Sequence, residues 1–322
     1  MKKIFRTTYL ALLLIAGLSC NNDPMPDAPK EQRPISFDNI ATRAGLSDLK
    51  TNGFGVWAVF GNEAQPTGYW LLDNERVYWE VDHWTYDDTQ LWVDNSVFGF
   101  FACYPQNADF VKDEDNISVT MTYETPDAAN EDILVATQFV DTSEDYAEVV
   151  GLTFNHLFSK VNIRVKQNKG TNEHDQFIID KITLRNVKSK GTCTALHNWD
   201  VEWEYDNTTK TFTKDIPGDD IINFETGIML SDEGLLLLPQ TISANTIELE
   251  VAFRHGLEGE DDISNFESKT YRAYLPNTVE QWEAGKSYTY TAQVSTYNPI
   301  VFLPPMVESW GGSQSGGTII IK

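Results

Sequence analysis

Cys20 is the first residue in this chain whose position indicates a chemical modification. A basic head at residues 2–6 and an apolar run at residues 9–18 precede it, which is the pattern of an export signal over residues 1–19. The run is too short to span a bilayer. Because bacteria attach lipid to a cysteine that directly follows such a run, Cys20 is predicted to become the acylated N-terminus of a lipoprotein. The alternative is an ordinary secreted protein that is cleaved nearby, with an incidental thiol.

A second covalent step is expected at the bond between Arg43 and Ala44. Arg43 is the basic residue nearest the portion expected to fold, it follows a short apolar stretch, and it precedes a small residue. An extended, protease-accessible bond is therefore predicted there. Residues 20–43 hold prolines among polar residues as far as Pro34, so they are predicted to be a tether or propeptide.

Motifs of enzyme chemistry are absent from the sequence. It contains no HExxH, CxxC, Walker or GxSxG motif, and its five histidines are scattered. Residues 53–58 fit the letters of a dinucleotide-binding loop, yet residues 59–61 continue as strand and turn instead of opening a helix. The acidic residues at 258–262 lack the spacing of a calcium loop and are typical of a solvated turn. We therefore expect no enzyme activity, no cofactor and no bound metal.

The chain is strongly acidic. It has 48 Asp and Glu residues against 24 Lys and Arg, a formal net charge of −24. This charge argues against nucleic acid as a partner and would be repelled by an anionic membrane surface. The lipid at Cys20 is therefore the predicted means of attachment to the outer membrane. Cys103 and Cys193 are too few to form a disulfide framework, and whether they pair stays open.

Apolar residues alternate with polar ones along much of the sequence. The clearest runs are residues 117–123, 161–166, 247–253 and 288–294. Such alternation predicts strands with one buried face. The continuous apolar runs at 97–102 and 235–238 predict strands covered on both faces. With no convincing amphipathic helix, the fold is predicted to be all-β, built from antiparallel β-sandwiches.

The acidic stretch at residues 141–145 is the predicted boundary between two domains. It divides the mature chain into an N-terminal domain at 44–148 and a C-terminal domain at 149–322. Five of the nine tryptophans fall in the first of these, namely Trp57, Trp70, Trp79, Trp84 and Trp92. Clustered tryptophans could form a sugar-stacking platform, but in a sandwich large aromatic residues more often fill the core.

A series of short motifs follows the Arg43-Ala44 junction in a characteristic order. The segments are 56–60, 77–79, 84–86, 98–105, 132–136, 152–161, 182–186, 190–192, 238–240, 282–288 and 307–310. The series resembles the fimbrillin-like (Mfa-like) family, the subunits of type V pili in Bacteroidetes, over essentially the whole exported chain. In this sequence Cys103 stands where an aromatic residue is more usual, and Gly17 stands where leucine is usual in the lipid box.

The resemblance implies two tandem transthyretin-like β-sandwich domains and export as a lipoprotein. In polymerising members it also implies removal of an N-terminal segment by an Arg-directed protease. The implied partners are other pilus subunits, a host or bacterial surface receptor, and the outer membrane, which the lipid anchor reaches. The implied location is a cell-surface fimbrium.

The two ends of the exported chain are candidates for strand exchange. Residues 34–43, with Ile35 and Phe37 on one face, could fill a groove that cleavage after Arg43 would open. The C-terminal pieces 300–310 and 318–321, joined by a glycine-rich link, could enter that groove from a neighbouring subunit and build a filament. Their candidate anchors are Val307, Trp310, Ile319, Ile320 and Ile321. Alternatively, both pieces fold back as a hairpin and complete their own sandwich.

Two functions remain open for the sequence. The first is a structural or adhesive pilus subunit. The second is a surface glycan-binding lipoprotein that uses part of the tryptophan cluster and does not polymerise. Polymer formation distinguishes them.

Overall fold

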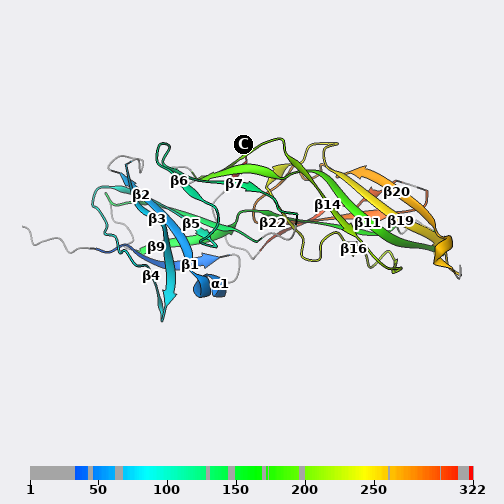
Figure 1. The fold of residues 1–322 in the computed structure, drawn as a ribbon, viewed down its shortest axis with the longest axis horizontal. Coiled ribbons are helices and arrows are strands. Elements are labelled where there is room, and N and C mark those ends of the chain that lie inside the picture. Colours follow the sequence, from blue (N-terminus) through cyan, green and yellow to red (C-terminus); the bar gives the residue numbers. More distant parts are fainter. Residues whose placement is uncertain are drawn as a thin grey trace, which may run out of the picture. The chain divides into compact units, whose positions relative to one another are not determined.

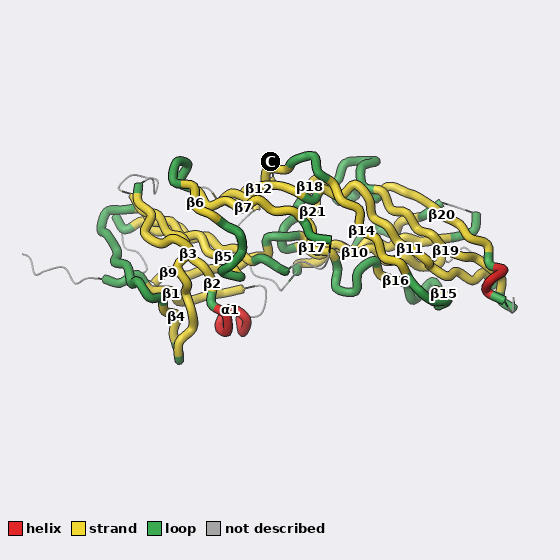
Figure 2. Tube along the Cα trace, viewed as in Figure 1, coloured by secondary structure: helices red, strands yellow, loops and turns green. Residues whose placement is uncertain are grey.

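The structure, a computed structural model, describes residues 33–42, 46–61, 68–127, 131–143, 149–168, 172, 174–195, 200–259, 262–297, 299–310 and 319–321. The export signal, Cys20, Arg43 and Ala44 lie outside the described residues. Residues Arg33–Lys322 make up one structural unit. Nearly all of its regular structure is strand, which confirms the predicted all-β class (Figure 1, Figure 2). Within the described ranges, no helix has the length and apolar character of a membrane span.

A seven-stranded sheet contains most strands of the first part of the chain, in the order β1-β9-β8-β5-β2-β3-β4. Their bounds are β1 (Ser36–Thr42), β2 (Phe54–Gly61), β3 (Tyr69–Glu80), β4 (His83–Thr85), β5 (Val97–Tyr104), β8 (Leu134–Asp141) and β9 (Val149–His156). All neighbouring pairs are antiparallel except β1 and β9, which run parallel. The central strands β2 and β5 are buried at almost every position, as predicted for residues 97–102.

The α-helix α1 (Leu46–Asn52) precedes β2. It buries only Leu49 and so lacks the periodic apolar face from which a helix is predicted. It ends at Gly53, whose N–H donates to the Leu49 carbonyl at 2.8 Å. Gly53 has a φ of +75°, and a Cβ there would lie 2.7 Å from the Val77 carbonyl oxygen. This helix end therefore requires glycine, and the dinucleotide-like letters that follow form strand β2.

A five-stranded sheet packs against one face of the first sheet, in the order β25-β13-β12-β7-β6. Its strands are β6 (Val111–Asp113), β7 (Ser118–Glu124), β12 (Lys190–Ala195), β13 (Val201–Tyr205) and β25 (Ile319–Ile321). The core between the two sheets contains Trp57 and Phe101 from the first and Met121, Cys193 and Trp203 from the second. A separate core cluster covers the other face of the seven-stranded sheet. These layers form the first β-sandwich.

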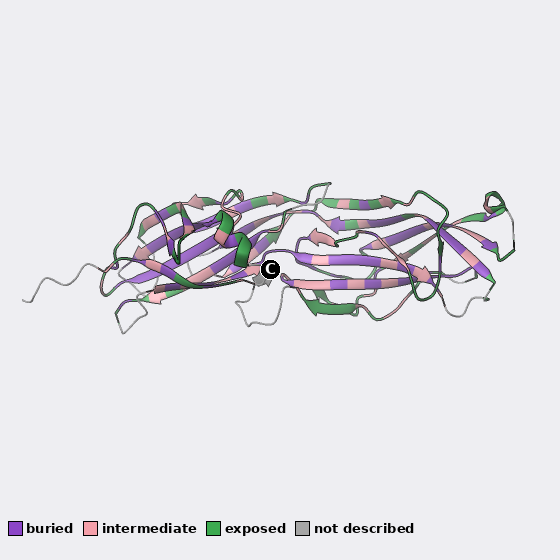
Figure 3. Ribbon diagram, turned by 90° about the horizontal axis from the view of Figure 1, so that it is seen from below, coloured by how far each residue is buried: buried purple, intermediate pink, exposed green. Residues whose placement is uncertain are grey.

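Two further sheets enclose the core of a second sandwich. One has the order β16-β10-β22-β23, with β17 also on β10 and β24 also on β22; the other has the order β14-β11-β19-β20, with β15 also on β11. The first contains β10 (Ser159–Gln167), β16 (Ile228–Met229), β17 (Leu235–Leu237), β22 (Lys286–Val294), β23 (Val301–Phe302) and β24 (Met306–Ser309). The second contains β11 (Asp175–Lys188), β14 (Thr209–Asp215), β15 (Ile221–Ile222), β19 (Glu248–Leu257) and β20 (Glu267–Tyr274). The remaining elements are the short pair β18 (Gln240–Thr241) and β21 (Gln281–Trp282) and the 3₁₀ turn η1 (Ile263–Asn265). Buried residues recur along the strands of both sandwiches (Figure 3).

Strand pairing crosses the predicted boundary between residues 148 and 149. Strand β9, which begins at Val149, lies between β1 and β8, and strand β12 pairs with β7. Only Ser189 separates β11 from β12, so the chain passes directly from the second sandwich back into the first. The sheets of the two sandwiches are thus built from interleaved parts of the sequence.

Candidate functional site

The N-terminal candidates Ile35 and Phe37 lie in the core on the outer face of the seven-stranded sheet. Their exposed fractions are 1% and 3%. The Phe37 ring meets the rings of Phe54, Tyr86 and Phe100 edge-on, with centroid distances of 6.5, 5.5 and 6.1 Å. Because aromatic side chains bury a large apolar area, Phe37 is the main anchor of this segment. The segment therefore fills an apolar groove of its own chain.

Main-chain hydrogen bonds hold the same segment on two sides. Strand β1 pairs in parallel with β9, with an irregular register between Asp38 and Ala41. Just before β1, the Ile35 N–H donates to the Gln90 carbonyl at 2.8 Å, and the Ile35 carbonyl accepts from the Tyr86 hydroxyl at 2.9 Å. Parallel pairing is slightly less stable per residue than antiparallel pairing, and the irregularity shortens the ladder further. Buried side chains therefore contribute most of the attachment of β1.

The predicted cleavage site lies outside the described residues, at Arg43 and Ala44. It is bracketed by the end of β1 at Thr42 and the start of α1 at Leu46. Cleavage between them would leave β1 attached to the rest of the protein only by the non-covalent contacts given above.

Departure of β1 would uncover one edge of β9 together with part of the core. Strand β9 alternates buried and half-buried residues, and its Val150, Leu152 and Phe154 belong to the core that also holds Phe37. The uncovered surface would be an unpaired strand edge beside the exposed apolar side chains of the core. This is the arrangement that accepts an added strand from another chain.

The C-terminal candidates occupy places in two different sheets. Strands β23 and β24 pair antiparallel with β22 and so belong to the second sandwich. Residues Ile319, Ile320 and Ile321 form β25, which pairs in parallel with β13 in the first sandwich. The two described pieces therefore join separate sheets and do not pair with each other as a hairpin.

Strand β24 buries none of its four side chains. Met306 is 51% exposed and Val307 is 44% exposed. Beyond its pairing with β22, the segment is held at Trp310, whose N–H donates to the Gly285 carbonyl at 2.9 Å. The Trp310 ring stacks on the ring of His156, with centroids 3.7 Å apart and an interplanar angle of 10°. Main-chain pairing and one ring stack thus hold β24, without a contribution from the core.

His156 is a functional candidate that the sequence did not reveal. It is the last residue of β9, and it is almost fully buried. Its Nδ1 lies 2.6 Å from Asp132 Oδ2, which fixes the orientation of the ring under Trp310. The flanking residues of His156 and Trp310 carry no pattern that connects them, because the contact arises only when β24 returns along β22.

Three of the five tryptophans of the N-terminal part are core residues, and the other two pack against the cores. Trp57 lies in the core between the two sheets of the first sandwich, and Trp84 and Trp92 lie in the core around Phe37. Trp70 and Trp79 are partly buried against the same two cores. The structural interpretation is confirmed for Trp57, Trp84 and Trp92, which are buried and cannot stack on a sugar.

Cys103 and Cys193 are both free and buried. Burial raises the pKa of the Cys103 thiol to about 12 and raises the pKa of the Cys193 thiol as well. Since the thiolate is the reactive form of cysteine, both thiols are structural in this fold. Among the described residues, no group of three or more His, Cys, Asp and Glu side chains is placed to hold a metal ion.

A family model described as fimbrillin-like matches residues 42–310, from the last residue of β1 to Trp310. The chain belongs to the fimbrillin-like family. This confirms the resemblance that the order of motifs indicated. Among proteins with curated descriptions, none matches this fimbrillin-like chain.

Solved structures resemble this fimbrillin-like protein over most of its length. A fimbrial protein from Bacteroides vulgatus matches with a TM-score of 0.66 and 18% identity, over 86% of this chain and 99% of that chain. A candidate cell adhesion protein from Bacteroides uniformis matches with a TM-score of 0.45 and 15% identity, over 87% and 98% of the two chains. A fimbrial assembly protein from Parabacteroides distasonis has a TM-score of 0.39 and 10% identity, over 86% and 95%. At 18% identity, the first match establishes a shared fold alone.

Proposed function

We propose that this fimbrillin-like protein is a structural or adhesive subunit of a cell-surface fimbrium. It is exported as a lipoprotein acylated at Cys20, and cleavage after Arg43 starts its assembly. The observation that carries the proposal is strand β1, which ends directly before Arg43 and keeps Phe37 in the core. The family match and the fold shared with the Bacteroides vulgatus fimbrial protein support the same assignment.

Loss of β1 would expose apolar surface to water, and a replacement strand could cover that surface. Burying an apolar side chain such as Ile or Phe contributes about 1.5–3 kcal/mol. The N-terminal segment buries three of them, Ile35, Phe37 and Ile40. A subunit without this segment exposes the matching core side chains to water, so a strand that covers them is strongly favoured. When the neighbour supplies that strand head to tail, the contact repeats without closing and builds a filament.

The C-terminal segment has the properties of a donor. In the single subunit the apolar residues Met306 and Val307 of β24 are exposed, so moving residues 306–310 into a groove would gain burial. Ile300 and Phe302, which precede β24, belong to or pack against the core of the second sandwich, so the proposed donor begins after them. Its release would break the pairing of β24 with β22 and the stack of Trp310 on His156. These are small losses compared with the apolar area that a vacant β1 groove offers.

An assembly experiment tests the proposal directly. The exported chain with Cys20→Ala is trimmed with an Arg-specific protease, and N-terminal sequencing verifies that the new terminus is Ala44. We expect electron micrographs to show fibres, and unboiled samples to run as ladders in detergent gels. The Arg43→Gln chain keeps β1 attached and is expected to stay monomeric under the same treatment. Trimmed protein that remains monomeric would reject strand exchange.

A synthetic peptide covering Ile300 to Lys322 identifies the receiving site. When it is added to trimmed protein, the proposal predicts new protection from hydrogen exchange in β9, whose edge β1 has left. A peptide with Val307→Asp, which places a charge on the apolar strand, should protect β9 much less. Protection confined to β22 and β13 would show that the terminal strands belong only to their own sheets, and exchange through them would have to be abandoned.

A further inference from the structure

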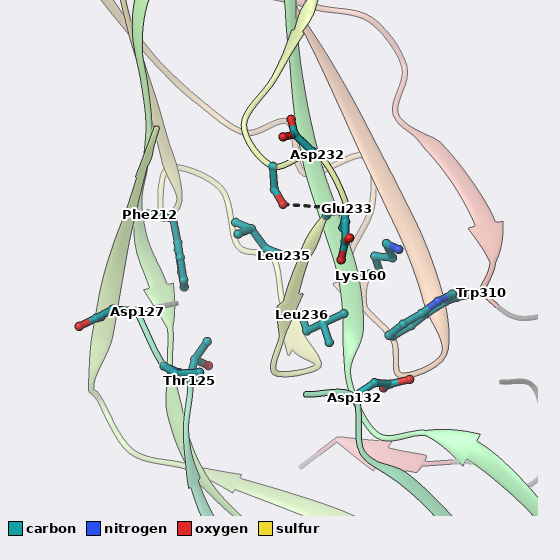
Figure 4. Close-up of a pocket in the computed structure, with 13 residues that line it drawn as sticks. Thr125, Asp127, Asp132, Lys160, Phe212, Asp232, Glu233, Leu235, Leu236 and Trp310 are labelled. Carbon is teal, nitrogen blue, oxygen red and sulfur yellow. Dashed lines mark hydrogen bonds between the residues drawn. The ribbon is translucent and has the colours of Figure 1, made fainter. Parts of the chain in front are cut away.

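Figure 4 shows a pocket of about 610 Å³ where strands of the two sandwiches meet. Its polar groups are mostly engaged within the chain. Two lysines of β14 form ion pairs with Asp127 and Asp232, at 3.0 and 2.8 Å, and Lys160 Nζ lies 5.4 Å from the centroid of the Trp310 ring. A second pocket, which shares only Pro126 with the first, lies beside main-chain groups that are not engaged.

Strand β7 has a free edge over its last residues. On one side, β12 pairs along β7 as far as Glu124. On the other side, β6 pairs only with Ser118 to Thr120, and the chain before β6 does not continue the ladder. In the described part of the chain, the edge of residues 121–124 that faces away from β12 therefore has no strand beside it.

Alternation along β7 shows which main-chain groups are free. The Thr125 N–H donates to the Ser189 carbonyl, directly before β12, at 2.7 Å. Because residues of an antiparallel ladder alternate in the edge to which they hydrogen-bond, the groups of Tyr123 also point to β12. The N–H and C=O groups of Thr122 and Glu124 then point to the free edge. Two donors and two acceptors are thus presented to any strand that lies beside them.

A pocket of about 430 Å³ lies along this edge. Its apolar wall includes Tyr123, Pro105 and Ala108, which are all half-buried and therefore accessible to a ligand. Tyr123 and Ala108 also pack against the core between the sheets of the first sandwich. Since successive side chains of a strand point to opposite faces, an added strand would direct every second side chain toward this wall.

The charged side chains around the pocket are all acidic. Asp109, Glu124 and Glu131 line it and are exposed, and none of the described lining residues is Lys, Arg or His. Glu124 has Lys190 Nζ at 3.8 Å, whereas Asp109 and Glu131 have no ion pair within the described residues. A basic segment is therefore attracted to this edge, and an acidic one is repelled.

These features together select an extended peptide as the occupant. A free strand edge pairs with the main chain of an added strand, and the pocket beside it accepts alternate side chains. Apolar side chains would lie against Tyr123 and Ala108, and basic side chains would lie on the face of Thr122 and Glu124. The donor segment at residues 306–310 does not fit this edge, because it contains Glu308 and no basic residue.

We propose that the free edge of β7 binds an extended segment of a partner protein, in which basic residues alternate with apolar ones, as an added strand. The site goes beyond the fimbrial role. It lies on a different sheet from the β1 groove, and it depends neither on cleavage after Arg43 nor on polymerisation.

Binding is measured by calorimetric titration on the uncleaved exported chain with Cys20→Ala. The probe is a heptapeptide of alternating lysine and valine with blocked ends, and we expect it to bind. A lysine–serine peptide has the same charge without the apolar face, and its Kd should be higher by about tenfold or more. A glutamate–valine peptide keeps the apolar face and reverses the charge, and it should not bind.

Hydrogen exchange resolved to single amides locates the peptide. The N–H groups of Thr122 and Glu124 should exchange rapidly in the free chain and gain protection when the lysine–valine peptide is added. The N–H of Tyr123, which points to β12, should change little.

Two N-methylated peptides test the main-chain contacts without changing the protein. One is methylated on the main-chain nitrogens of its lysines, and the other on those of its valines. Successive N–H groups of an added strand point alternately toward β7 and away from it, so only one of the two peptides should keep binding.

Variants of Thr122 test the same contacts from the side of the protein. Thr122→Pro removes an N–H that points to the free edge and makes no bond to β12, so Kd should rise by about tenfold. Thr122→Val also loses the hydroxyl but keeps the N–H, and its Kd should match that of the parent.

Four results would overturn the proposal. The lysine–valine peptide does not bind; or the lysine–serine peptide binds as well, which would reduce the effect to charge alone; or both N-methylated peptides bind equally, which would exclude strand pairing. The fourth is protection gained in β9 instead of at Thr122, which would assign the peptide to the other sheet. Each is independent of whether trimmed protein forms fibres.

Discussion

Cys103 on β5 and Cys193 on β12 lie on facing sheets of the same core, yet both remain free thiols. Burial raises the pKa of both, to about 12 for Cys103, so almost no thiolate forms at neutral pH. Thiol–disulfide exchange proceeds through the thiolate and needs access to the sulfur. At these two residues the fold therefore withholds reactivity even in an oxidising compartment.

Neither buried thiol should react in the native exported chain. In the Cys20→Ala background, iodoacetamide at about pH 8 should leave Cys103 and Cys193 unmodified for hours, because both side chains are fully buried. The same reagent in denaturant should modify both, as counted by intact mass. Rapid labelling of either residue without denaturant would show that the core opens far more easily than its packing indicates.

Glu250 is a buried acidic residue of the second sandwich that lies between two arginines. It lies on β19 between Arg185 on β11 and Arg272 on β20, with closest N–O distances of 2.8 and 2.6 Å. Burial on its own raises the pKa of Glu250, but the hydrogen bonds and charges of the two arginines outweigh it, and the pKa falls below its usual range. A carboxylate with a lowered pKa stabilises the fold above its unfolded pKa and loses this contribution as pH falls through the folded pKa.

Glu250→Gln should therefore destabilise the protein in a pH-dependent manner. At about pH 7 we expect a loss of about 1–3 kcal/mol in the free energy of unfolding, since charge-assisted hydrogen bonds are replaced by neutral ones. As pH falls through the lowered folded pKa of Glu250, the parent carboxylate is protonated too, and the difference should disappear. Urea unfolding across this range measures both. Glu267→Gln, at a largely exposed carboxylate paired with Lys269, should show almost no difference at any pH.

At the scale of single residues, the sequence predicted which side chains share the buried face of a strand better than it predicted which side chains contact one another. Ile35 and Phe37 stand two positions apart, so they share one face of a strand, and the structure buries both. The sequence named Trp310 as a candidate anchor for strand exchange, which stays a prediction, and its stack on His156 could not be foreseen.

At the scale of elements, β1 and β24 are attached to the protein in opposite ways. Strand β1 relies on buried side chains and an irregular parallel ladder, whereas β24 relies on an antiparallel ladder and exposes all of its side chains. Removing apolar contacts should therefore affect β1 strongly and β24 weakly. This difference is the physical reason why β1 is suited to fill a groove in its own chain and β24 is suited to be donated to a neighbouring subunit.

Phe37→Ala should cost about 3–5 kcal/mol of unfolding free energy, as expected for truncating a buried phenylalanine. The exposed neighbour on the same strand provides the control, and Ala41→Ser should stay within about 0.5 kcal/mol of the parent. Urea titrations of the uncleaved chain measure both. A cost below about 1 kcal/mol for Phe37→Ala would show that β1 is held by its main chain, and the groove argument would lose its basis.

Most strands could be predicted from alternation, but their partners could not. The runs at 161–166, 247–253 and 288–294 fall within β10, β19 and β22 or directly adjoin them. Helix α1 was missed because seven residues with one buried side chain leave no periodic pattern. The place of β12 beside β7 was also hidden, because strand partners far apart in sequence are chosen by the closing of the core and not by local residue types.

At the scale of the whole molecule, both segments of the proposed strand exchange, β1 and the β24 segment, contact β9. Its edge holds β1, and its last residue, His156, holds Trp310 at the end of the β24 segment. Interleaving of the two sandwiches produces this meeting, since β9 directly precedes β10 of the second sandwich. Loss of β1 and release of β24 would therefore each remove contacts from β9.

Anchoring is a separate property of the whole exported chain, and it depends on Cys20. Replacing Cys20 with Ala should move the protein from the membrane fraction to the soluble fraction, because the acidic chain has no other expected means of attachment. A clickable fatty acid should label the parent and not the variant. Cys103→Ser is the matched control and should still be labelled. Unchanged labelling of Cys20→Ala would refute the lipoprotein assignment.

Release of the C-terminal segment should be controlled by the stack of Trp310 on His156. A ring pair of this kind contributes about 0.5–1.5 kcal/mol, so Trp310→Ala should speed hydrogen exchange in β24 by roughly 2- to 10-fold. Trp310→Phe keeps a ring against His156 and should stay close to the parent. Protection of β1 should be unchanged in both uncleaved variants, because its side chains belong to another core.

After trimming at Arg43, Trp310→Ala should form ladders faster than Trp310→Phe, since its donor strand leaves β22 more often. Equal exchange in β24 for the two variants would show that pairing with β22 alone holds the segment, and the stack would then have no part in timing assembly.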